Sequence, residues 1–168
     1  MGALHKGHES LILESKKRCD ITICSIFVNP TQFNDKTDYE NYPKNLDSDL
    51  AILKNLNCDI VYCPTKNDIY DKIGVSKKFQ FNGINEILEG QYRPGHFDGV
   101  ATIVEKLFNI IEPDYAFFGE KDLQQLYVIK QLVKNLNIKT QIIGCPTIRE
   151  NNGVAKSSRN QLISKEDL

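Results

Sequence analysis

The chain begins MGALHKGHESL, and the residues there that could do chemistry are two histidines three positions apart, His5 and His8. In a loop that enters a helix, residues at this spacing point to the same side. Gly2 and Gly7 let the backbone come close to a ligand, and a helix that starts near His8 offers unpaired N–H groups to an anion. Two imidazoles at such a place donate hydrogen bonds to phosphate oxygens as charge builds up in a transfer step.

Two other interpretations of this histidine pair stay open. A metal site needs further ligands, but the third histidine, His96, is far away in the sequence, and no Cys or Glu stands at ligand spacing. A surface turn followed by an amphipathic helix is the plainer explanation, and on this motif alone we favour it.

A second candidate is the loop KSSR at 156–159. Lys156 supplies charge, Arg159 supplies a bidentate fork, and the hydroxyls of Ser157 and Ser158 lie between them. A solvated polar loop is the common alternative. Together with an HxGH start on an α/β sheet, however, the loop is typical of a two-part phosphate clamp, in which one part closes over the triphosphate.

A third candidate is FFGEKDLQQL at 117–126, where a strand end and a glycine precede three charges. Lys121 at such a strand end has an obvious partner in a phosphate group. Asp122 is as well explained as a helix N-cap, and Glu120 stands beside them. Gln124 and Gln125 are amides on the first helical turn, so that one can face a ligand while the other faces solvent.

The fourth candidate is SIFVNPTQF at 25–33. Pro30 biases Asn29 away from helix and stiffens the turn. Asn29 and Gln32 then present amides to hydroxyls or to a carboxylate, although a plain polar turn after a strand is the first choice for this stretch in isolation.

The elements that must position these residues alternate along the chain. Nearly continuous apolar runs predict buried strands at 21–28, 58–63, 114–119 and 140–145, and helical periodicity predicts helices at 8–18, 46–56, 99–111 and 122–136. Such alternation indicates an α/β fold with a Rossmann-like, doubly wound parallel sheet. Residues 66–98 fit less well and predict an irregular excursion with a short strand around Phe79 and a turn at 93–95.

Composition is that of an ordinary soluble globular domain. The 168 residues carry a formal net charge of -1, which favours neither nucleic acid nor an anionic membrane surface as a partner. No run approaches the length of a membrane span, and no signal-peptide pattern follows Met1. The five cysteines form no CxxC pair, so we expect buried free thiols, with Cys24, Cys58 and Cys63 in or beside strands, and a cytoplasmic protein.

Taken together, the motifs resemble one family. MGALHKGHESL, SIFVNPTQF, EGQYRPGHFDGVATIVEKLFNII, FGEKDLQQL and GVAKSSRN occur in the order found in the pantothenate synthetases, or pantoate–β-alanine ligases. The resemblance covers almost the whole chain and implies an HxGH nucleotidyltransferase-like core. It implies that ATP and Mg²⁺ activate pantoate as pantoyl adenylate, that β-alanine then attacks the acyl group, and that the protein is a homodimer.

The resemblance also implies roles for individual residues. His8 acts as proton donor, His5 and Lys121 lie on the phosphates, Ile148 contacts adenine through its backbone, and Gln32 touches both pantoate and β-alanine. Asn29 and Gln125 lie beside pantoate. The implied ATP site consists of Met1, Gly2, Ala3, Leu4, His5, Lys6, Gly7, His8, Gly119, Glu120, Lys121, Asp122, Ile148, Lys156, Ser157, Ser158 and Arg159.

Some positions depart from the family pattern. Lys156 stands where many members have leucine or methionine, so its partner, solvent or phosphate, stays open. Asp47 and Asp49 lie near acidic residues that some members associate with magnesium, but a surface helix explains them equally well, and the metal ligands stay open. Members carry a strand and helix before HxGH and a lid domain after SSRN. We therefore expect a nucleotide-binding domain at 1–160 without its first strand, followed at 161–168 by the start of a truncated second domain, with Ser164 as N-cap.

Two rival functions stay open. A non-catalytic nucleotide-binding fragment shares every motif, and another HxGH nucleotidyltransferase, acting on a phosphate ester, accounts equally well for HKGH and KSSR. That second rival does not account for the two amide-bearing stretches, NPTQF and DLQQL, which suit the uncharged polyol end of a carboxylic acid. The leading hypothesis is the ligase.

Overall fold

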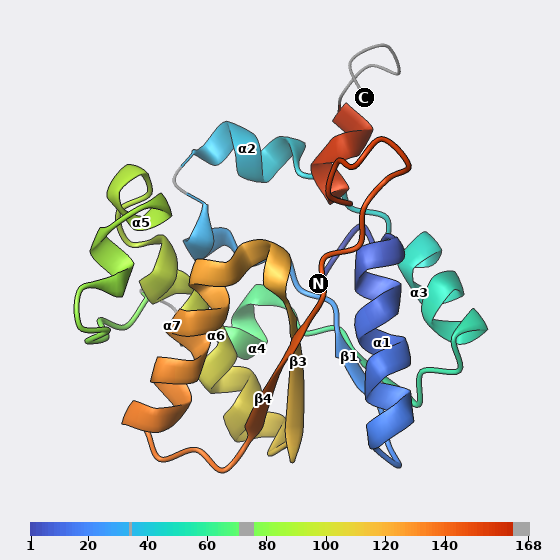
Figure 1. The fold of residues 1–168 in the computed structure, drawn as a ribbon, viewed down its shortest axis with the longest axis horizontal. Helices are drawn as coiled ribbons and strands as arrows, with labels where there is room; N and C mark the ends of the chain where they lie inside the picture. The colour runs from blue at the N-terminus through green and yellow to red at the C-terminus, as the bar shows by residue number, and fades with distance from the viewer. Residues whose placement is uncertain (34, 71–75, 163–168) are drawn as a thin grey trace.

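The computed structural model describes residues 1–33, 35–70 and 76–162, in which helices and strands alternate (Figure 1). The four strands are β1 (Ile23–Ser25), β2 (Ile60–Tyr62), β3 (Tyr115–Gly119) and β4 (Gln141–Cys145). The helices are α1 (Lys6–Arg18), α2 (Lys36–Asn41), α3 (Leu46–Asn55), α4 (Lys66–Ile69), α5 (Glu89–Tyr92), α6 (His96–Ile111) and α7 (Leu123–Asn135). The four predicted strands and four predicted helices are confirmed, and β1 and β2 are shorter than predicted.

The four strands pair in parallel, and an isolated antiparallel bridge joins Arg149 to Ala155. β1 pairs with β2 in the register Cys24 to Val61, and β3 pairs with β4 in the register Phe117 to Ile143. The predicted single sheet is instead two separate two-stranded sheets, because β1 and β3 share no ladder. A cavity of about 900 Å³ lies between them, lined by residues of both strands and of α6.

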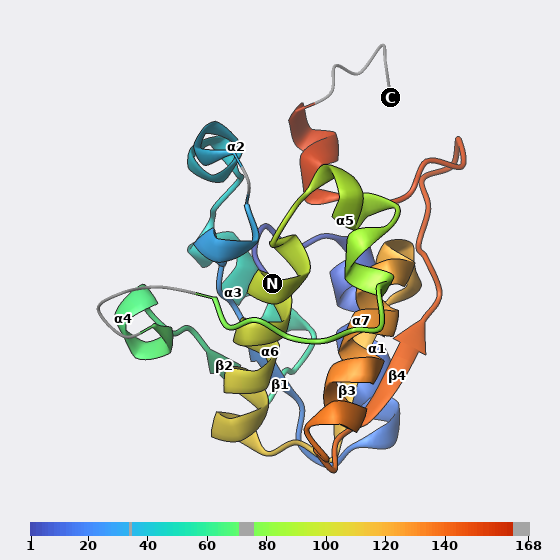
Figure 2. The ribbon, with the colours of Figure 1, turned by 90° about the vertical axis from the view of Figure 1, so that its left-hand side faces the viewer.

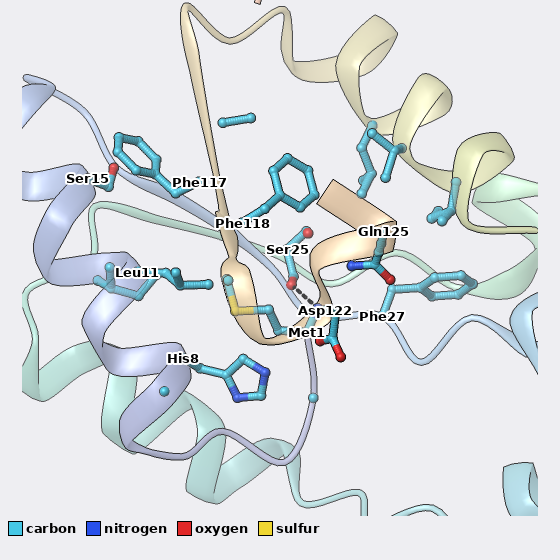
Figure 3. A pocket seen from close by; sticks show the side chains of 18 of the residues that line it. Met1, His8, Leu11, Ser15, Ser25, Phe27, Phe117, Phe118, Asp122 and Gln125 are labelled. Carbon is cyan, nitrogen blue, oxygen red and sulfur yellow. Dashed lines mark hydrogen bonds between the residues drawn. The ribbon is translucent and has the colours of Figure 1, made fainter. Parts of the chain in front are cut away.

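Helices cover both faces of the strands (Figure 1). On one face, α6 and α7 form the larger core, with Ile129 and Leu132 fully buried against Ala116 and Phe118 of β3. On the other face, α1 and α3 pack against β1 and β2 through Ile12 and Leu53. Side chains alternate along a strand, so β3 serves both layers, and Figure 3 shows Phe117 on the α1 side near Ser15.

Residues 76–98 contain two short helical turns, at Ile84–Glu86 and in α5, and the predicted turn at 93–95 is present. The predicted strand around Phe79 is wrong. The Phe79 N–H donates to the Asp98 carboxylate of α6 at 3.1 Å, and its ring stacks on Phe81. The segment is therefore bonded to a helix side chain and has no neighbouring strand to pair with.

The remaining sequence predictions concern the burial of the cysteines, a helix at the end of the chain and the absence of a membrane span. All five thiols are free, and Cys24 and Cys145 are buried, but Cys63 is exposed, so its predicted burial is wrong. The helix predicted to begin at Ser164 lies outside the described residues. Within the described part, no helix is long and apolar enough to cross a membrane.

The loops that carry the candidate residues gather at one end of the molecule. Figures 1 and 2 show α2, α5 and the helical turn Ser158–Leu162 at the same end, beyond the carboxyl ends of the strands. In parallel α/β sheets this is the end where ligands bind. The fold thus brings the four candidate stretches to one edge.

Candidate functional site

The loop of residues 1–5 lies along the edge of β1 and leads into α1. The terminal amine of Met1 donates to the Ser25 carbonyl at 2.8 Å, and the Phe27 N–H donates to the Met1 carbonyl at 2.9 Å. α1 begins at Lys6 with His5 as its N-cap, slightly before the predicted start. The loop therefore delivers both histidines to the first turn of α1, beside the cavity.

The two imidazoles lie together, with ring centroids 4.0 Å apart. His5 Nδ1 accepts from the Gly7 N–H at 3.1 Å, so in the neutral ring the proton sits on Nε2, which remains a free donor. A Cβ at Gly7 would stand 2.8 Å from the His5 ring, so glycine is the residue that lets the ring fold back onto the helix start. The glycine inside HxGH is thus part of the histidine geometry.

His8 points into the cavity (Figure 3). Burial, and then the neighbouring His5, lower its pKa from 6.5 to about 3. Its Nδ1 is buried and has no hydrogen-bond partner among the described residues. Burial also lowers the pKa of His5, and the charges of Lys121 and Lys156 lower it further. Both rings are therefore neutral near pH 7 and act as hydrogen-bond donors and acceptors.

Among the cations that line the cavity, Lys121, Lys156 and Arg159 each hold a carboxylate. Lys121 donates to Asp122 at 2.7 Å, Lys156 pairs with Glu150, and Arg159 pairs with Asp38 of α2 at 2.9 Å. These pairs are partly exposed to solvent, where an ion pair contributes little stability. The cations are therefore available to a stronger anion such as a triphosphate. Among the described residues, the partner of Lys156 is Glu150.

The amide loop is held by α6 and by Tyr70, the residue that follows α4. Asn29 is 2% exposed. Its Nδ2 donates to the Gly99 carbonyl at 3.1 Å, and its Oδ1 accepts from the Tyr70 hydroxyl at 2.5 Å. The amide of Asn29 thus fixes the loop, and both Asn29 and the less buried Gln32, three residues later, line the cavity.

Two residues that the sequence did not single out as site residues lie behind Gln32. His96 Nδ1 lies 2.7 Å from the Gln32 carbonyl, and Arg93 Nη2 donates to the same oxygen at 3.1 Å. His96 is buried, which lowers its pKa. The signal was present in the motif RPGHFDGV, in which a histidine and an arginine precede an apolar helix.

The two glutamines of α7 take different sides, but the predicted exposure of one of them to solvent is wrong, because Gln124 is partly buried and bonded to other residues. Gln125 lines the cavity, and Figure 3 shows it on the wall opposite His8, next to Asp122. Gln124 bonds the start of α5 and the helical turn before it. Its Nε2 donates to the Ile84 carbonyl at 2.7 Å, and its Oε1 accepts from the Glu89 N–H at 3.1 Å. Asp122 precedes α7, but its side chain bonds Lys121 and does not cap the helix.

The predicted ATP-site residues fall into two groups. Those that line the cavity are Met1, Gly2, His5, Gly7, His8, Gly119, Lys121, Asp122, Ile148, Lys156, Ser157, Ser158 and Arg159. Outside the lining are Ala3, Leu4, Lys6 and Glu120. Ala3 and Leu4 are buried beneath the loop, Lys6 reaches Glu9 on the outside of α1, and Glu120 lies against Gly144 of β4. These four do not face the cavity.

A magnesium site made of side chains alone is not part of this geometry. Within the described ranges, no three ligating side chains come together. Both oxygens of Asp49 accept backbone N–H groups, at 3.0 Å from Ala3 and 2.6 Å from Leu4, and Asp47 is exposed on the surface of α3. Magnesium is commonly held by substrate phosphates with one or two carboxylates, so these residues do not by themselves fit a protein cage for the ion.

Comparison with known proteins gives the family. The family model described as pantoate-beta-alanine ligase matches residues 1–168. The pantothenate synthetase of Flavobacterium psychrophilum is 51% identical over 99% of this chain, and that of Acinetobacter baylyi is 50% identical over 99%. The match covers 60% and 59% of those proteins, so the chain spans about three fifths of the length of these curated relatives.

Solved structures give the same result. The Francisella tularensis pantoate-beta-alanine ligase, a complex with beta-gamma ATP and beta-alanine, matches with a TM-score of 0.95 and 48% identity over 99% of this chain and 64% of its own. The pantothenate synthetase of Thermus thermophilus matches with a TM-score of 0.94 and 39% identity over 99% of this chain and 60% of its own. The chain therefore belongs to the pantoate–beta-alanine ligase family.

Proposed function

We propose that this chain binds ATP and pantoate and supplies the adenylation chemistry of a ligase that joins (R)-pantoate to β-alanine. The observation that carries the proposal is the meeting of HxGH, Lys121 and KSSR around one cavity whose far wall holds Gln32 and Gln125. The family match and the Francisella tularensis complex with beta-gamma ATP and beta-alanine support it.

In the proposed first step, the pantoate carboxylate attacks the α-phosphorus of ATP. The bond to the bridging oxygen breaks and pyrophosphate leaves, so that negative charge moves onto the departing oxygens. His5 and His8, as neutral rings, donate hydrogen bonds to these oxygens, while Lys121, Lys156 and Arg159 exchange their carboxylate partners for phosphate. We propose that magnesium enters as the complex with ATP.

In the proposed second step, the amine of β-alanine attacks the acyl carbon of pantoyl adenylate, AMP leaves, and the amine loses a proton. Gln32 and Gln125 hold the hydroxyls and carbonyl of pantoate from opposite elements. Asn29 supports Gln32 through the loop, since its own amide is committed to Gly99 and Tyr70. The apolar side chains of β3 that line the cavity exclude water, which protects an acyl adenylate from hydrolysis.

The test is a product assay with ATP, magnesium and pantoate, run with and without β-alanine. The proposal predicts AMP and pantothenate in equal amounts when β-alanine is present. ATP binding without pantoate-dependent AMP favours the non-catalytic nucleotide-binding fragment. Nucleotide transfer to a phosphate ester in place of pantoate favours the other nucleotidyltransferase.

We further propose a homodimer, from the family resemblance, and a cytoplasmic location, from the five cysteines that form no CxxC pair. Light scattering on the purified protein tests the first. A mass equal to one 168-residue chain at micromolar concentration contradicts a stable dimer.

A further inference from the structure

Ala3 has an unusual backbone conformation. Its φ is +48°, in the left-handed region that L residues with a Cβ avoid, and it stands two residues before His5. Such a conformation persists when the surroundings hold it from several sides. What holds Ala3 therefore also sets the direction in which the chain approaches the histidine pair.

The backbone N–H of Ala3 is held by Asp49. This aspartate of α3 is 2% exposed, and its carboxylate accepts from the Ala3 N–H at 3.0 Å and from the Leu4 N–H at 2.6 Å. A buried carboxylate is costly unless it is hydrogen-bonded, and these two bonds use both of its oxygens. α3 is thereby tied to the loop at the place where the loop is strained.

The backbone carbonyl of Ala3 is held by Ser158. Its hydroxyl is 4% exposed and donates to the Ala3 carbonyl at 3.0 Å, with the Gly2 carbonyl at 3.5 Å. Ser158 belongs to KSSR, so this bond joins the two halves of the predicted phosphate clamp across 155 residues of chain. The hydroxyl faces the loop backbone, although the sequence suggested that it binds phosphate.

We infer that Asp49 and Ser158 are positioning residues, which grip the two sides of the Ala3 residue and so hold His5 and His8 in register with the KSSR loop. The inferred consequence for catalysis rests on the proposed function, whereas the consequence for the ligand-free histidine pair does not. Both side chains bond the backbone of the loop, and through that backbone they act on the two histidines.

The decisive variant is Asp49→Asn in the full chain, with Asp47→Asn as its control. The asparagine keeps the shape of the side chain but turns an amide donor toward one backbone N–H, so one of the two bonds is lost. Asp47 lies on the same helix and is exposed, so its variant removes the same charge without touching the loop. Urea unfolding establishes that each variant is folded.

The readout is the histidine ring resonances of the ligand-free protein between about pH 5 and 8, the range around the ordinary histidine pKa, assigned with His5→Gln and His8→Gln. In the parent protein the His8 resonance is expected to stay flat over this range, because burial lowers the pKa of His8 to about 3. Asp49→Asn is expected to shift or broaden the His5 and His8 signals and to move the His8 titration toward its ordinary pKa of about 6.5, with His96 unchanged. Asp47→Asn should overlay on the parent.

Unchanged His5 and His8 signals in Asp49→Asn overturn the inference, and so does an equal change at His96, since that indicates general loosening. If Asp49→Asn does not fold, Ser158→Ala serves instead and should move the same two signals in the same direction by a smaller amount.

The catalytic arm compares adenylation rates. Asp49→Asn should lower kcat by about 10- to 100-fold, the effect expected of a small misplacement of catalytic groups. The KM for pantoate should stay nearly unchanged, because Gln32 and Gln125 lie on other elements. An active parent with an equally active Asp49→Asn overturns the positioning role. If the parent is inactive but its His5 and His8 resonances still respond to Asp49→Asn, the proposed function is wrong. The inference that Asp49 and Ser158 position the loop is then still supported.

Discussion

His8 combines a buried position with a ring nitrogen that finds no partner in the described part of the chain. The sequence predicted that His8 and His5 face a phosphate, and it associated His8 with proton donation. The lowered pKa of about 3 refines this role, because a ring that is neutral at pH 7 donates a hydrogen bond through its N–H. A phosphate bound beside it favours the charged form and raises that pKa.

The first prediction at the residue scale concerns His8 itself. His8→Ala should lower the adenylation rate by roughly 100-fold, the scale of one lost donor to a developing charge. Lys121→Ala should act similarly, and Lys130→Ala, an exposed lysine on α7, is the control. The measurement is pantoate-dependent AMP formation; full turnover in His8→Ala removes the residue from the mechanism.

The second residue-scale prediction is an acid-sensitive stability. The fold holds His8 neutral down to about pH 3, while in the unfolded chain it gains a proton near pH 6.5. The unfolded state therefore binds more protons than the folded state below pH 6.5. The free energy of unfolding is accordingly highest above that pH and decreases as the pH falls. The slope that His8 alone contributes should rise from a small value near pH 7 toward about 1.4 kcal/mol per pH unit near pH 5.

Urea unfolding from about pH 7 to about pH 5, across the ordinary histidine pKa, checks this slope. His8→Gln should show a flatter decline than the parent by that amount. His5 and His96, whose pKa values burial also lowers, add slope of the same sign in both proteins. Parallel curves for parent and variant contradict the prediction.

Residue types predicted which side chains gather at the candidate site, but they did not predict which way each side chain faces. The cations and histidines were predicted because their charge and spacing have few other uses at the end of a parallel sheet. The sequence did not specify the partners of Ser158 and Glu120 within the protein, since a hydroxyl or carboxylate in a loop serves a backbone or a ligand equally well until the fold is known. Their contact with ATP stays a prediction. For Asp49 a surface helix explained the sequence as well as a magnesium site did, and the structure instead buries its carboxylate against the backbone of residues 3 and 4.

At the scale of elements, the contact between α6 and the loop of residues 29–32 sets the position of Gln32, the residue that we propose binds pantoate. A Cβ added at Gly99 would lie 2.4 Å from the Thr31 carbonyl oxygen, which is backbone and cannot turn aside. Gly99→Ala should therefore push Gln32 out of place, destabilise the protein by about 1–3 kcal/mol, and raise the KM for pantoate more than that for ATP.

Thermal or urea unfolding together with separate KM measurements tests this. Gly119→Ala, where an added Cβ meets nothing within 4 Å, is the stability control. A Gly99→Ala protein with the stability of the parent and an unchanged KM for pantoate shows that the contact between Gly99 and Thr31 does not position Gln32.

Helices were easier to predict than the segments between them. α6 and α7 are marked by long apolar periodicity, and their ends lie close to the predicted ones. The segment 76–81 carries aromatic residues that favour strands, but strand formation needs a neighbour with free ladder groups, and here Asp98 and Thr102 of α6 take the backbone N–H groups. That outcome depends on tertiary contacts which local sequence does not encode.

At the scale of the whole molecule, the two parallel strand pairs stand on either side of one cavity, and the candidate residues line it. The α/β class and the parallel pairing follow from the alternation of apolar runs and helices. The division into two sheets does not, because the sequence pattern specifies that strands are buried without specifying which strands are neighbours. The chain covers about three fifths of its curated relatives, and within that part the candidate site is assembled.

The proposed chemistry of this cavity is the formation of pantoyl adenylate, and isotope exchange between pyrophosphate and ATP measures that step by itself. With ATP, magnesium and labelled pyrophosphate, the label should enter ATP when pantoate is added and β-alanine is absent. The exchange should fall by roughly 100-fold in His8→Ala. Label that never enters ATP despite measurable ATP binding, or that enters equally without pantoate, contradicts the account.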